Sequence, residues 1–64
     1  MIKLDAMPNS GQFLAIWVYL GLPWAETMRW EHNTLMRYNT DSDSFHTVDI
    51  NDYNDLDVTF YTVE

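Results

Sequence analysis

The segment that decides the fold runs from Gln12 to Leu20 and reads QFLAIWVYL. Side chains alternate between the two faces of a strand, so this segment presents an apolar row on each face. A small antiparallel sheet needs only one apolar face to build a core. The second face therefore has to be covered by another part of the chain or by another molecule, and it consists of Leu14, Ile16, Val18 and Leu20.

On both sides of this strand the sequence predicts further strands separated by turns. Pro8–Gly11 favours a turn before it, and Leu20–Pro23 favours a tight reversal after it. Trp24–His32 alternates between apolar and polar residues, and turn formers at Thr40–Asp43 separate two aromatic-bearing strands. We therefore predict a single mainly β domain over residues 1–64, a small antiparallel meander of four to five strands that forms a curled sheet or a partly open barrel.

The two ends of the chain add a short strand and a helical turn. Residues 1–7 predict a short edge strand, and residues 58–64 predict the last strand. Between them, Asp49 is suited to cap one short helical turn near 49–56. The side chains expected to face inward from this turn are Ile50, Tyr53 and Leu56.

A helix from Pro23 to Tyr38 is the competing interpretation. Pro23 suits the first position of a helix, and several apolar residues after it share one helical face. Asn33 and Thr34, however, fit a hairpin turn better than a helix interior. We therefore prefer two strands over this stretch.

The core has to be built without cross-links. The chain has no cysteine, and a 64-residue domain buries only roughly 60% of its surface on folding. Trp17, Trp24 and Trp30 are expected to stack across the sheet. The second face of the central strand is then covered either by a homodimer partner or by the helical turn folding back over it, and the sequence leaves both open.

Charge is the most distinctive global property of the sequence. The formal net charge is −7, and no lysine or arginine follows Arg37. Nucleic acids and anionic membranes are poor partners for such a surface, whereas a basic protein surface is a suitable one. The acidic residues that we expect to bind this partner are Asp41, Asp43, Asp49, Asp52, Asp55, Asp57 and Glu64.

Residues that could support catalysis or metal binding form no recognisable motif. His32 and His46 are the only histidines, and neither aspartate-rich stretch has the glycine and glutamate of an EF-hand. Ser42 and Ser44 lie near His46, but in a stretch of turn formers. We therefore predict a protein that is not an enzyme and that needs no cofactor or metal.

Two functional classes are compatible with these features. In size, acidity and lack of cysteine the chain resembles the small acidic proteins that phages use against host defence, such as anti-restriction and anti-CRISPR proteins, although no motif is shared. This resemblance implies an inhibitor that occupies the basic, nucleic-acid-binding surface of a host protein. If Asp55 and Asp57 lie in a strand, their spacing of about 6.6 Å is comparable to that of phosphates. The alternative is a structural or homodimeric interaction module whose acidity only gives solubility.

The expected location is the cytoplasm, that of a host cell if a phage encodes the protein. The first twelve residues hold one lysine and no continuous apolar run, so they do not resemble a secretion signal. The apolar run from Phe13 to Leu22 is about half the ~20 residues of a membrane-spanning helix.

Overall fold

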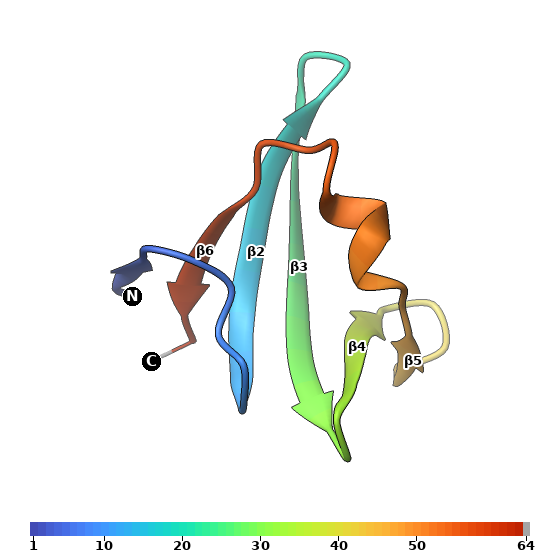
Figure 1. Cartoon of the computed structure of the whole chain (residues 1–64). Helices are drawn as coiled ribbons and strands as arrows, with labels where there is room; N and C mark the ends of the chain where they lie inside the picture. Colours follow the sequence, from blue (N-terminus) through green and yellow to red (C-terminus); the bar gives the residue numbers. More distant parts are fainter. Residues whose placement is uncertain (64) are drawn as a thin grey trace.

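The computed structural model describes residues 1–63, in which six strands form one open antiparallel sheet with the order β1-β6-β2-β3-β4-β5 (Figure 1). The mainly β prediction is confirmed. The alternative helix from Pro23 to Tyr38 is wrong, because these residues form two strands joined by a turn. The elements are β1 (Lys3–Leu4), β2 (Gln12–Tyr19), β3 (Leu22–Glu31), β4 (Thr34–Asn39), β5 (Ser44–Thr47), the 3-10 helix η1 (Ile50–Tyr53) and β6 (Thr59–Thr62).

The path of the chain departs from a simple meander after β5. Strands β2 to β5 follow one another across the sheet, but β6 returns to pair with β2 and β1. Neighbouring strands lie about 4.8 Å apart, so the chain travels on the order of 19 Å from β5 to β6. Residues 48–58, which we call the cover segment, make this crossing over one face of the sheet (Figure 1).

Both long hairpins close with two-residue turns in which each φ is positive. The turn between β2 and β3 is Leu20 (φ 53°) and Gly21 (φ 78°), and that between β3 and β4 is His32 (φ 51°) and Asn33 (φ 60°). Positive φ at both positions is the geometry of a type I′ turn, which matches the twist of hairpin strands. The first turn is tighter than predicted, so β3 already begins at Leu22. The register pairs that flank the turns are Tyr19↔Leu22 and Glu31↔Thr34.

The core lies on one face of the sheet, between the strands and two crossing segments. Its fully buried members come from β2, β3 and β4, and the side chain of Phe13 is in edge contact with that of Phe60 on β6. On the same face, the Trp30 Nε1–H donates a 2.7 Å hydrogen bond to the carbonyl oxygen of Pro8, which fixes the loop before β2. The buried residues are Phe13, Ala15, Met28 and Leu35, and those packed against them are Met7, Trp17, Trp30, Val48, Tyr53, Val58 and Phe60.

The opposite face of the sheet carries Leu14 and Ile16, which are half-buried. The cover segment and the loop before β2 both pack on the Phe13 face, so neither covers these two side chains. The alternative in which the helical turn folds over Leu14 and Ile16 is therefore wrong. Tyr53 lies in edge contact with Trp17, on the other side of the strand.

Candidate binding surface

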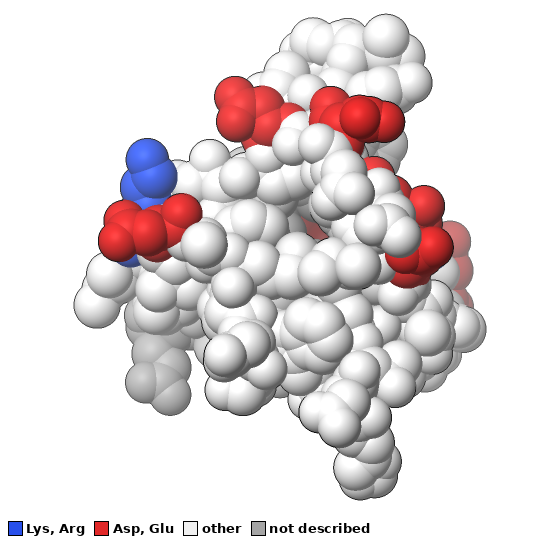
Figure 2. Space-filling model, in the orientation of Figure 1, with Lys and Arg blue, Asp and Glu red and all other residues white. Residues whose placement is uncertain are grey.

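The cover segment presents four aspartates to solvent. Asp49 is the N-cap of η1, because its Oδ1 accepts a 2.9 Å hydrogen bond from the backbone N–H of Asn51. Asp52 lies within η1, whereas Asp55 and Asp57 follow it in the turn that leads to β6, and all four residues are exposed. Since neither of the last two lies in a strand, the predicted strand-like spacing of their carboxylates does not apply. Figure 2 shows acidic groups below the upper projection of the molecule and along the right of the view.

The cover segment is held to the sheet by Glu26 on β3. The Tyr53 O–H donates a 2.9 Å hydrogen bond to Glu26 Oε2, and Arg37 Nη1 lies 3.5 Å from Glu26 Oε1. The Tyr53 ring meets that of Trp17 edge-on at a centroid distance of 5.9 Å. Burial, followed by the hydrogen bond to Glu26 and its negative charge, raises the pKa of Tyr53 well above that of a free tyrosine. These contacts give the aspartates a fixed platform.

Both arginines are already paired with glutamates of β3. Arg29 Nη2 lies 2.9 Å from Glu31 Oε2 and its guanidinium sits 3.8 Å from the Phe45 ring centroid, while Arg37 pairs with Glu26. Within residues 1–63, no ion pair joins an aspartate of the cover segment to a lysine or arginine. Like charges at this density repel one another, which disfavours the folded state of the free protein.

Asp41 and Asp43 lie in the four-residue loop between β4 and β5. The Oδ1 of Asn39 accepts hydrogen bonds from the backbone N–H groups of Asp41 (2.9 Å) and Ser42 (3.2 Å), which shapes the loop. The Tyr38 O–H donates to Asp43 Oδ1, and this hydrogen bond raises the pKa of Tyr38. The loop precedes β5 and the cover segment follows it, so both lie at the same edge of the sheet (Figure 1). Glu64, the last residue of the predicted acidic surface, lies outside the described residues.

The same loop brings Ser42 and His46 together. Ser42 Oγ lies 2.8 Å from His46 Nε2, and Ser44 Oγ lies 3.2 Å from the same nitrogen. These side chains are exposed, and the hydrogen bonds among residues 1–63 place no carboxylate on the imidazole. A catalytic Ser–His pair needs an orienting partner and a place for the substrate, so this contact is a surface network of the loop.

Residues 1–63 show neither a cluster of metal ligands nor a membrane-spanning helix. In that part of the chain, no three histidine or acidic side chains come close enough together to hold a metal ion. No helix there has the length and apolar character needed to cross a membrane.

The predicted apolar interface is divided between two places. Leu14 and Ile16 lie half-buried on the uncovered face, whereas Val18 and Leu20 are 66% and 84% exposed near the end of the β2–β3 hairpin. Sequence reasoning missed three further exposed side chains at this end, and one of them, Trp24, was expected in the core. The missed residues are Tyr19, Leu22 and Trp24.

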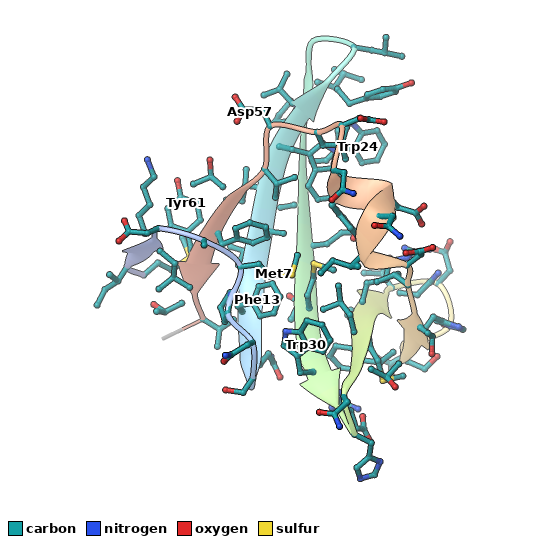
Figure 3. The ribbon with its side chains drawn as sticks, viewed as in Figure 1. Met7, Phe13, Trp24, Trp30, Asp57 and Tyr61 are labelled. Atoms are coloured by element: carbon teal, nitrogen blue, oxygen red, sulfur yellow. The ribbon has the colours of Figure 1, made fainter. Side chains whose placement is uncertain are left out.

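The end of this hairpin projects beyond the rest of the sheet (Figure 1). Strand β6 pairs with β2 only from Phe13 to Ile16, and β4 pairs with β3 only from Met28 to Glu31. Residues 18–24 form a two-stranded ribbon, which we call the hairpin tip. Figure 2 shows carboxylates directly below its white projection, and Figure 3 places Asp57 and Trp24 at its base.

Comparisons with known proteins gave no match: no family model, no curated protein and no solved structure is significantly similar to this chain. The functional assignment consequently rests on the geometry and charge described above.

Proposed function

We propose that this chain is a non-enzymatic acidic binding protein, an inhibitor that occupies the basic, nucleic-acid-binding surface of another protein. The observation that carries the proposal is the contrast in charge pairing. The exposed aspartates of the cover segment have no cationic partner within residues 1–63, whereas both arginines pair with glutamates on β3. A basic partner would relieve the repulsion between these carboxylates and would speed association by long-range attraction.

The contacts that hold the cover segment to the sheet support the same proposal. A surface that competes with nucleic acid has to hold its charges in place, because ordering a mobile segment on binding weakens affinity. Asp49 is fixed as the cap of η1, and Tyr53 ties the segment to Glu26. As in phage proteins that act against host defence, such a surface would need no catalytic residue.

A second candidate is a homodimeric module whose acidity only gives solubility. The specific observation in its favour is the uncovered face with Leu14 and Ile16. The two candidates differ in salt dependence, since a hydrophobic dimer contact does not weaken as salt screens exposed charges. Sedimentation equilibrium at low and high salt, with wild type and Ile16→Glu, separates them: self-association that Ile16→Glu abolishes favours the module.

The test of the proposed function is association kinetics with the protein captured from an extract of the cells in which this chain acts. Asp49, Asp52, Asp55 and Asp57 are replaced together by asparagine. We expect the variant to associate at least about tenfold more slowly at low salt, with a smaller difference at high salt.

A charge-relocated variant is the matched control for net charge. It carries the four asparagines and adds four new acids at exposed positions away from the cover segment, so its net charge is again that of wild type. Recovery of wild-type association by this control would contradict a role for the cover segment. The added changes are Ile2→Glu, Asn9→Asp, Ser10→Asp and Gln12→Glu.

A further inference from the structure

The hairpin tip combines two features that are unfavourable in the free protein. Its apolar side chains are exposed, with Leu20 at 84%, Val18 at 66% and Leu22 at 60%. Leu20 also adopts a φ of 53°, a left-handed conformation that is unfavourable for a residue with a Cβ. Asparagine or glycine is the usual residue at this position of a type I′ turn. Neither feature contributes to the core, because the tip lies beyond the strands that pair with its two sides.

An unfavourable backbone conformation that is retained at Leu20 indicates a role for the leucine side chain itself. Projecting apolar residues on a hairpin ribbon are typical of an anchor that enters a pocket of a partner. Trp24 (49% exposed) and Tyr19 (52% exposed) widen the same ribbon, and both are residue types enriched in binding hot spots.

The charges around the tip indicate what kind of pocket it fits. No charged residue occurs from Phe13 to Ala25, so the ribbon itself is neutral. The turn after η1, which holds Asp55 and Asp57 and which we call the acidic turn, lies at the base of the ribbon. This follows because Tyr53 contacts Trp17, and Trp17 pairs with Trp24. Asp55 and Asp57 follow Tyr53 in this turn, and both are exposed. A pocket that receives the tip would therefore have its rim next to carboxylates.

We propose that the hairpin tip is an apolar anchor that inserts into a nonpolar pocket, rimmed by lysine or arginine, on the basic partner protein. This inference rests on the proposed function and adds the element that fixes the complex after electrostatic attraction has formed it. A second copy of the chain is a poorer occupant, because the same acidic turn would face its equivalent. An anionic membrane is disfavoured for the same electrostatic reason.

The decisive variant is Leu20→Asn, because it separates binding from folding. Asparagine followed by Gly21 is the preferred pair for a type I′ turn, so we expect a melting temperature higher by roughly 4–8 °C. Affinity for the purified partner should fall at least about tenfold, mainly through faster dissociation, because the buried leucine is lost. Unchanged affinity of this folded variant would overturn the proposal.

His32→Asn is the matched control. It occupies the first position of the other two-residue turn, at the opposite end of β3, with a nearly identical φ of 51°. We expect unchanged affinity for the same partner. If His32→Asn weakens binding as much as Leu20→Asn, the effect is not specific to the tip and the anchor is excluded.

Photo-crosslinking identifies the occupant directly. Benzoylphenylalanine at position 20 should crosslink to an apolar peptide of the partner flanked by lysine or arginine, whereas the same group at position 32 should not. A crosslink from position 20 to a second copy of this chain would overturn the proposal. So would co-sedimentation with phosphatidylcholine or phosphatidylglycerol vesicles that Leu20→Asn abolishes.

The two proposals can fail separately. If the asparagine variant of the cover segment binds weakly while Leu20→Asn binds normally, the acidic function holds and the anchor is wrong. If Leu20→Asn binds weakly while the charge variant associates normally at low salt, the tip is an anchor for a partner that is not recognised by charge, and the proposal of a basic rim is wrong.

Discussion

The hydroxyl of Tyr53 donates a 2.9 Å hydrogen bond to Oε2 of Glu26, across a sequence separation of 27 residues. This bond joins the acidic cover segment to the middle of β3. Because Glu26 is charged and only partly exposed, Tyr53→Phe should destabilise the protein by about 1–2 kcal/mol, measured as the shift in free energy of unfolding in urea.

Tyr38→Phe is the matched control for this change. Tyr38 on β4 also donates to a carboxylate, that of Asp43 in the β4–β5 loop, but this hydrogen bond is exposed to solvent. We expect no measurable change in stability. Equal effects of the two substitutions would show that the Tyr53–Glu26 bond has no special role in holding the cover segment.

Alkaline pH should weaken the fold through the same tyrosine. Burial and the neighbouring Glu26 raise the pKa of Tyr53 above its ordinary value of 10.0, so the unfolded chain releases this proton at lower pH than the folded protein. The stabilising contribution is complete below about pH 10 and is lost as the pH rises above it.

The check is the urea midpoint at about pH 8 and about pH 11 for wild type and Tyr53→Phe. The variant should lose less stability over this interval, since it has no hydroxyl to ionise at that position. An identical loss in both proteins would assign the alkaline sensitivity elsewhere.

The two faces of β2 should respond differently to substitution. Phe13→Ala empties a fully buried site and should cost about 3–5 kcal/mol, most of the stability of a domain this small. Ile16→Glu places a charge on the uncovered face and should leave the circular dichroism spectrum intact. Unfolding of a monomeric Ile16→Glu variant would mean that this face is part of the internal core.

The alternation of side chains along the strands and the residues that favour turns made much of the fold predictable. Alternation identified β2, and turn formers located the β4–β5 loop at Thr40–Asp43. The cap at Asp49 and the helical turn after it are confirmed as well. The turn between β3 and β4 is one residue earlier than predicted, at His32 and Asn33, because the sequence around it offers several residues that tolerate positive φ.

The path of the cover segment was not predictable from the sequence. The spacing of three predicted that Ile50, Tyr53 and Leu56 all face inward, and this is wrong for Ile50, which is 45% exposed. Both faces of β2 are apolar, so nothing local selects the face on which the turn packs. In the structure the Tyr53 hydroxyl bonds to Glu26 on the Phe13 face, and a partner 27 residues away is not visible in the local pattern.

The hairpin tip was missed for a related reason. Trp24 has the composition of a core residue, and its exposure follows from where the neighbouring strands end.

The acidic surface should cost the free protein stability. Replacing Asp49, Asp52, Asp55 and Asp57 by asparagine removes repulsion, and asparagine preserves the cap of η1. We expect a melting temperature at least equal to that of wild type at low salt. A marked decrease would mean that these carboxylates stabilise the fold, which is an alternative reason for their presence.

Competition for the captured partner tests the central claim most directly. The partner is first bound to a short fluorescein-labelled duplex DNA, and release of the duplex is followed by fluorescence anisotropy as this protein is added. We predict that wild type displaces the duplex and that the charge-relocated variant, with the same net charge, does so at least about tenfold less effectively. Equal displacement by both proteins, or a stable ternary complex with wild type, would contradict an acidic surface that occupies a nucleic-acid-binding site.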